Sequence, residues 1–170
     1  MSVDSLRVGD CGKVVIGIGG LAIRQSHAGL IITHALGSCL GVTAWDATNR
    51  IGGMLHAQLP LAQQNQQRAA TQPSLFVDLG LTLLLKHVID LGADRRRLRL
   101  VVAGGANMNA GGNDVFQIAA RNLTVFRKTL WRESLVVAAE EVGGGVPRTM
   151  TLRLDSGETI IDSQGQRRAI

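Results

Sequence analysis

Cys39 and His56 are the residues of this sequence whose types and spacing could support nucleophilic catalysis. A thiol attacks as its thiolate, and a nearby imidazole can take the thiol proton. Cys39 follows Gly37 and Ser38, two small residues that let the backbone turn tightly, and backbone amides in such a turn could stabilise an oxyanion. Thr33 precedes Cys39 by six positions and is a candidate for the third group, which orients the imidazole.

The same residues have structural interpretations that their spacing alone leaves open. A single cysteine in an apolar run is usually a small buried hydrophobic residue, and Cys11 is interpreted as structural. Metal binding is disfavoured, because no His/Cys pair has the i, i+3 or i+4 spacing of metal ligands. The nearest approach to a ligand set is the single thiol of Cys39 with His34 before it and His56 after it. The sequence therefore predicts no metal site.

The composition predicts one compact domain spanning residues 1–170. Hydrophobic residues make up 45% and charged residues 18% of the chain, which excludes a disordered polypeptide. No apolar run approaches the roughly 20 residues that cross a bilayer, and the N-terminus lacks the basic start and apolar core of a signal peptide. Two cysteines are too few to indicate a secreted disulfide scaffold. We expect a soluble, cytoplasmic protein without membrane insertion.

The net charge of +5 raises the question of an acidic partner. The arginines are scattered apart from DRRRLR (residues 94–99) and the C-terminal QGQRR. Aromatic residues are only 3% of the chain, and none alternates with the arginines to stack on bases. We interpret the basic segment as a solvated rim and expect no nucleic-acid partner, while attraction to a negatively charged protein stays open.

The order of apolar and turn segments predicts an α+β fold with mixed or antiparallel sheets. The helices are expected from Ser74, as the capping residue, to the stop at Gly92, with residues 76, 79, 83, 84 and 88 on one face, and over residues 118–132. Residues 62–73 are glutamine-rich and predict a mobile loop. Asn107 and Asn113 could line a substrate groove or satisfy loop backbone. Strands are expected within residues 12–23, 29–37, 39–46, 51–59, 97–105, 134–145, 148–157 and 158–162, the last two as a hairpin.

Two phrases stand in a specific order, THALGSCLGVTAWD (residues 33–46) and then GGMLHAQLP (residues 52–60). FVDLGLTLLLKHVIDLGA, VVAGGANM, IAARNL and EEVGGGVPRTMTLRLDSG follow them along the chain. Together these phrases resemble the CheD family, the chemoreceptor glutamine deamidases of bacterial chemotaxis. The resemblance extends along nearly the whole sequence.

This resemblance implies that Cys39 is the nucleophile, His56 the general base and Thr33 the third member of a triad. The implied reaction hydrolyses a glutamine side-chain amide on the cytoplasmic helices of methyl-accepting chemotaxis receptors, giving glutamate and ammonia, without metal or organic cofactor. The implied fold has layered mixed β-sheets with helices packed on one outer face, and resembles that of toxin-type cysteine deamidases.

Two other functions stay open at this point. One is a docking module that regulates a CheC-type phosphatase, and the other is a thiol methylesterase acting on receptor methylglutamates. The joint presence of Cys39, His56 and Thr33 favours an enzyme over a docking module. Amide and ester hydrolysis share an acyl-enzyme route, so the sequence does not separate those two reactions.

Overall fold

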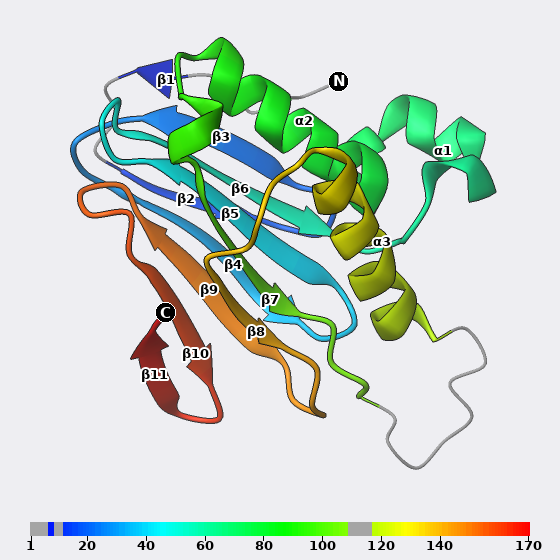
Figure 1. The fold of residues 1–170 in the computed structure, drawn as a ribbon. Helices are drawn as coiled ribbons and strands as arrows, with labels where there is room; N and C mark the ends of the chain where they lie inside the picture. Colours follow the sequence, from blue (N-terminus) through cyan, green and yellow to red (C-terminus); the bar gives the residue numbers. More distant parts are fainter. Residues whose placement is uncertain (1–6, 9–11, 109–116) are drawn as a thin grey trace.

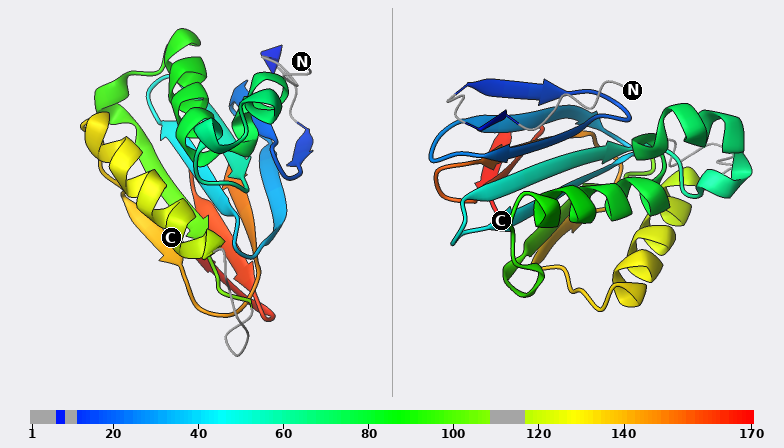
Figure 2. Two further views of the ribbon diagram at one scale, coloured as in Figure 1. Left: turned by 90° about the vertical axis from the view of Figure 1, so that its right-hand side faces the viewer. Right: turned by 90° about the horizontal axis from the view of Figure 1, so that it is seen from above.

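The computed structural model describes residues 7–8, 12–108 and 117–170, so Cys11 and Asn113 lie outside the described residues. In this part of the chain the elements stack in three layers (Figure 1). Figure 2 shows them edge-on: the helices, then a six-stranded sheet, then a five-stranded sheet. This arrangement confirms the predicted α+β class and the placement of the helices on one outer face.

The six-stranded sheet is the middle layer. All its neighbouring strands pair antiparallel except β1 with β3 and β7 with β8, which are parallel. Its central strands β5 and β6 are buried at every position, as expected of strands covered on both faces. In spatial order the strands are β1 (Arg7–Val8), β3 (Leu21–Gln25), β6 (Ile51–Ala57), β5 (Leu40–Asp46), β7 (Arg99–Gly104) and β8 (Ala139–Val142).

The five-stranded sheet covers the face of the middle sheet that the helices leave open. Its pairs are antiparallel except for β2 with β4, so both sheets are mixed, as predicted. An apolar cluster that includes Cys39, Met54, Met150 and Leu152 fills the space between the two sheets. In spatial order the strands are β11 (Gln166–Ala169), β10 (Thr159–Ser163), β9 (Arg148–Arg153), β4 (Leu30–Leu36) and β2 (Lys13–Ile16).

Two long helices, α2 (Val77–Asp90) and α3 (Ile118–Arg132), cover the other face of the six-stranded sheet (Figure 1). Leu81, Leu84 and Phe126 pack there against Val42 and Leu55 in a second apolar cluster. The helix predicted over residues 118–132 is confirmed at both ends. Within the described ranges, no helix is long and apolar enough to cross a membrane.

The start of α2 differs from the prediction. The helix begins at Val77, and Phe76 is its N-cap without a side-chain hydrogen bond. Ser74 lies instead in a short 3₁₀ turn, where its hydroxyl donates to the carbonyl of Gly19 at 2.6 Å. Leu79 was expected on the buried face but is 37% exposed, because the face of α2 that packs on the sheet is made of Val77, Gly80, Leu81, Leu84, Leu85 and Val88.

The predicted loop over residues 62–73 is also wrong. This segment forms a 3₁₀ turn (Ala62–Gln64), helix α1 (Gln66–Thr71) and the 3₁₀ turn Pro73–Leu75. Asn65 caps α1 by accepting from the Arg68 amide at 3.0 Å, a short-range signal that the glutamine-rich composition masks. The C-terminal strand β11 was not predicted.

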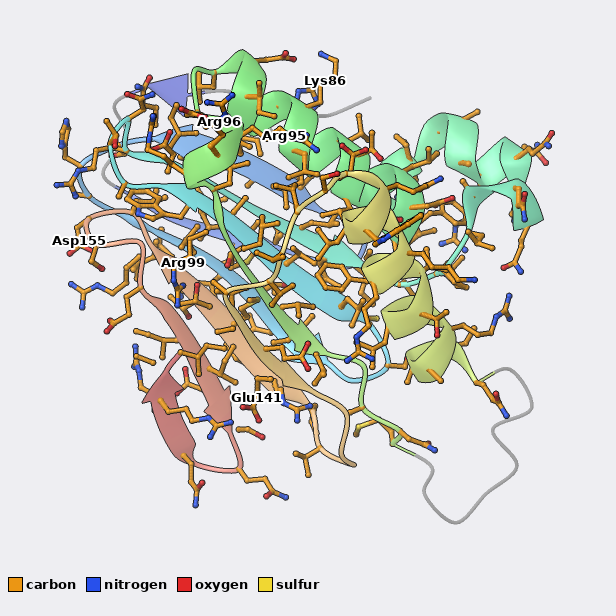
Figure 3. The ribbon with its side chains drawn as sticks, in the orientation of Figure 1. Lys86, Arg95, Arg96, Arg99, Glu141 and Asp155 are labelled. Carbon is orange, nitrogen blue, oxygen red and sulfur yellow. The ribbon has the colours of Figure 1, made fainter. Side chains whose placement is uncertain are left out.

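The basic segment lies at the end of the molecule where α2 finishes, as the labelled Arg95 and Arg96 show (Figure 3). Arg95 pairs with Glu133 at 2.9 Å, and Arg97 pairs with Asp46 at 2.9 Å. A third 3₁₀ turn (Arg95–Arg97) holds these side chains before β7. Two of the four arginines of this segment, Arg95 and Arg97, are therefore ion-paired, in line with the interpretation as a solvated rim.

Candidate active site

His56 lies in β6, and Cys39 lies in the turn directly before β5, the neighbouring strand at the centre of the middle sheet. The β5–β6 register places Gly41 directly opposite His56, and Cys39 stands two residues before Gly41. The last pair of this ladder is Leu40 with Ala57, so Cys39 stands just beyond the end of the strand that pairs with His56. Both side chains are almost fully covered, with 6% of Cys39 and 1% of His56 exposed.

Thr33 reaches His56 from the other sheet. Its Oγ1 lies 2.7 Å from His56 Nδ1 and also donates to the carbonyl of Ile16 at 2.9 Å. A hydroxyl has one proton, and a carbonyl can only accept, so the proton of Thr33 belongs to the bond with Ile16. His56 Nδ1 must then carry the hydrogen that completes the second bond.

This assignment leaves Nε2 of the neutral imidazole without a proton. His56 Nε2 is buried and has no hydrogen-bond partner among the described residues. A buried nitrogen lone pair with no partner is costly to folding and marks a position where a proton can be received. Nε2 is thus an open acceptor atom: among the described residues no group, Cys39 Sγ included, forms a hydrogen bond with it.

Burial sets the charge of both groups. Burial lowers the pKa of His56 from 6.5 to about 4. Burial also raises the pKa of the Cys39 thiol, an effect that the Cys39 backbone N–H only partly offsets. At neutral pH both groups are therefore uncharged, Cys39 as a thiol and His56 as a neutral imidazole.

A strained turn carries Cys39. The β4–β9 register shifts between Thr33 and Leu36, and Ala35 adopts a left-handed φ of 58°. The amide of Gly37 donates to the carbonyl of Ala35 at 2.9 Å, so it is not free to bind an oxyanion. The other predicted turn residue, Ser38, keeps its N–H free. Among the described residues, no backbone carbonyl accepts a hydrogen bond from the amide of Ser38 or from that of Cys39.

The glycine loop after β7 supports this turn. Gly105 donates its amide to the carbonyl of Cys39 at 2.8 Å, and Ala106 donates to that of Gly37 at 2.8 Å. Gly104 has a φ of +106°, and a Cβ built there would lie 2.1 Å from the Cys39 carbonyl oxygen. Sequence reasoning noted this loop without assigning it a role, although two glycines directly after a buried strand are a signal of close backbone approach.

The other residues singled out in the sequence lie apart from this site or play structural roles. His34 is exposed, and its Nδ1 lies 3.2 Å from Thr149 Oγ1. Asn107 donates its backbone amide to the carbonyl of Gly144 at 2.8 Å, which fits the loop interpretation. In the part of the chain that the structure describes, no group of three His, Cys, Asp or Glu side chains could hold a metal ion.

The fold and the site define an α+β protein with a buried cysteine, histidine and threonine at the end of its central hairpin. The model of the family described as CheD chemotactic sensory transduction matches residues 58–163. The chain belongs to this CheD family. The matched range begins two residues after His56, so the arrangement of Thr33, Cys39 and His56 rests on the geometry above.

Curated relatives match over most of both chains. A protein of Anaeromyxobacter dehalogenans, named "Probable chemoreceptor glutamine deamidase CheD 2", is 39% identical over 90% of this chain and 96% of its own. Similarly named CheD proteins of Solibacter usitatus and Thermococcus kodakarensis are 35% and 37% identical, over 93% and 86% of this chain and 93% and 89% of theirs.

Among solved structures, the Neisseria meningitidis protein NMB0706, described as a DUF152 family member, is 14% identical, with a TM-score of 0.40 over 74% of this chain and 52% of its own. A likeness of this size supports no argument about the chemistry.

Proposed function

We propose that this protein is a chemoreceptor glutamine deamidase, which hydrolyses a glutamine side-chain amide to glutamate and releases ammonia. Membership in the CheD family and the names of its relatives supply the reaction. The observation that supports the mechanism is the 2.7 Å contact of Thr33 Oγ1 with His56 Nδ1, because it leaves the unpartnered Nε2 to act as the base. The proposed domain spans residues 1–170 and acts in the cytoplasm on receptor helices.

Acylation begins when Cys39 Sγ attacks the amide carbon of the glutamine side chain. His56 Nε2 takes the thiol proton as the S–C bond forms, because the thiol is neutral at rest. We assign the developing oxyanion to the amide N–H groups of Ser38 and Cys39, which bond to no backbone carbonyl of the described residues. His56 then returns the proton to the leaving nitrogen, the C–N bond breaks, and ammonia departs from a thioester.

Deacylation uses the same groups. His56 Nε2 takes a proton from a water molecule, whose oxygen attacks the thioester carbon. Collapse of the second tetrahedral species breaks the C–S bond, restores the Cys39 thiol with the proton held by His56, and frees glutamate. Thr33 keeps Nδ1 protonated throughout, and it stabilises the imidazolium that forms in each half-reaction.

The test is ammonia release from purified receptor cytoplasmic domains, with intact mass of the receptor product. Wild type is compared with Cys39→Ala and His56→Ala, and Cys11→Ala serves as the matched cysteine control. We expect ammonia and an amide-to-acid mass gain with wild type and Cys11→Ala, and neither with the two site variants. Equal activity in wild type and Cys39→Ala would refute the thiol mechanism.

The names of the relatives favour amide hydrolysis over methyl ester hydrolysis as the main reaction. A CheC-type phosphatase partner stays a prediction from the family resemblance. It is tested by co-purification of this protein with such a phosphatase, with and without the receptor fragment as competitor.

A further inference from the structure

We propose that Asn122 is a positioning residue that holds Cys39 in register with His56. Its effect on catalysis rests on the proposed function. Asn122 is the fifth residue of α3 and is 0% exposed. Its amide nitrogen donates to the carbonyl of Ser38 at 3.0 Å and to that of Gln58 at 2.9 Å. Ser38 directly precedes the nucleophile, and Gln58 stands two residues after the base.

These two bonds replace a missing rung of the sheet. The last pair of the β5–β6 ladder is Leu40 with Ala57, and the next facing residues would be Cys39 and Gln58. Neither continues its strand, because the Gln58 amide donates to Leu75 and the Cys39 carbonyl accepts from Gly105. Beyond the ladder, the side chain of Asn122 therefore links the two chain segments, at the point where the reacting groups stand.

The chemistry of the two partners requires an amide here. Both partners are carbonyl oxygens, which only accept, so the atom between them must be the NH₂ group. A carboxylate of the same shape would present an acceptor to two acceptors, and an aliphatic side chain would offer no donor. The Asn122 Oδ1 atom is buried without a partner among the described residues, so the side chain is held in place by its two donated bonds.

Loss of this bridge should affect turnover more than binding. Attack needs Cys39 Sγ and His56 Nε2 in hydrogen-bond reach, and a displacement of about 1 Å can lower the rate roughly 100-fold. Asn122 carries neither reacting atom and bonds only the backbone carbonyls of Ser38 and Gln58, so its removal leaves the thiol and the imidazole themselves in place. A change in kcat with little change in KM distinguishes positioning from a general loss of folded protein.

The test compares Asn122→Ala and Asn122→Asp with Thr129→Val, a change of another buried polar residue on the same helix, 1% exposed. Deamidation kinetics give kcat and KM, and thermal melts report the folded fraction. Iodoacetamide alkylates Cys39 at a rate that depends on how firmly the turn holds the thiol. This rate is followed on the Cys39 peptide by mass spectrometry and is independent of deamidase activity. Both Asn122 variants should lose roughly 100-fold in kcat at near-constant KM. They should also alkylate faster than wild type, whereas Thr129→Val should match wild type in both assays.

The outcomes separate this proposal from the proposed function. Folded Asn122 variants with wild-type kcat and a wild-type alkylation rate would overturn the positioning role. If wild type itself released no ammonia, the deamidase proposal would fail. The alkylation rates alone would then decide whether Asn122 holds Cys39 in position. Faster alkylation in both Asn122 variants would then support the link between the strands, and unchanged rates would overturn it. Near-wild-type behaviour of Asn122→Asp would also overturn it, because that side chain keeps the shape and lacks the donors.

Discussion

Thr33 Oγ1 and His56 Nδ1 lie 2.7 Å apart and join the two sheets across their buried interface. Thr33 belongs to β4 of the five-stranded sheet, and His56 belongs to β6 of the six-stranded sheet. Because the Thr33 proton is committed to the Ile16 carbonyl, the contact selects one tautomer of the imidazole. The packing of one sheet on the other thus fixes which nitrogen of His56 carries the proton and which is left as an acceptor.

Replacing Thr33 by valine should remove this selection while keeping the side-chain shape. His56 Nδ1 and the Ile16 carbonyl would lose their partner, and we expect a loss of about 1–3 kcal/mol in the free energy of unfolding. The wrong tautomer would put a proton on Nε2, so kcat should fall by at least roughly 100-fold. Thr33→Ser keeps the hydroxyl and should retain most activity. Urea denaturation and deamidation kinetics check both effects, and an active Thr33→Val would refute the orienting role.

The reactivity of the thiol toward iodoacetamide should report its raised pKa. Burial raises the pKa of Cys39, so the thiolate fraction stays small at neutral pH. The alkylation rate should therefore keep increasing with pH, even above the pH range in which ordinary thiols ionise. The measurement is the rate of Cys39 modification at successive pH values, with a short unstructured cysteine peptide as the reference. A rate that is already at its plateau near neutral pH would show a preformed thiolate and contradict the resting state described above.

The buried His56 should make folding stability depend on pH. Its pKa is lowered from 6.5 to about 4 by burial, so the unfolded chain binds the proton first as the pH falls. Its contribution is fully present above about pH 6.5 and is lost progressively down to about pH 4, with a total of about 3 kcal/mol. The measurement is the free energy of unfolding at pH 7 and pH 4.5 for wild type and His56→Gln. Wild type should lose more stability than the variant, and equal losses would show that His56 titrates normally.

The sequence predicts the hairpin that carries the site because its signals are local. Alternating apolar runs separated by DATNR define β5 and β6, and the helix over residues 118–132 follows from its own periodicity. The predicted strand, turn and strand are therefore confirmed, with Cys39 directly before β5 and His56 in β6. Ser74 was given the wrong role because the alternative partner of its hydroxyl, the Gly19 carbonyl, is 55 residues away in the sequence.

The remaining parts of the site depend on contacts between distant segments. No local pattern shows that Asn122 bonds carbonyls 84 and 64 positions away, although a buried amide on the apolar face of a helix is a signal that it has specific partners. The same applies to the bond from Thr33 to Ile16, which follows from the parallel pairing of β2 with β4. Its position before Cys39 made Thr33 a candidate, the family resemblance implied its role, and the sheet packing gives the physical reason for its contact with His56.

Gly104 and Gly143 offer a matched pair for testing the support of the Cys39 turn. Both have left-handed backbones, with φ of +106° and +80°, so alanine is strained at either position by about 1–2 kcal/mol. A Cβ at Gly143 would meet nothing within 4 Å, whereas one at Gly104 would lie 2.1 Å from the Cys39 carbonyl oxygen. The clash is with backbone, which has no flexible side-chain end to move aside.

Gly104→Ala must therefore displace the turn, and with it the nucleophile. We expect Gly104→Ala to lose more stability than Gly143→Ala and to lose deamidase activity in the protein that remains folded, whereas Gly143→Ala should stay active. Thermal melts and ammonia release from the two variants check this difference. Equal activity in both would mean that the Cys39 turn can move without affecting the reaction, and the close packing of the Gly104 loop would then matter for folding alone.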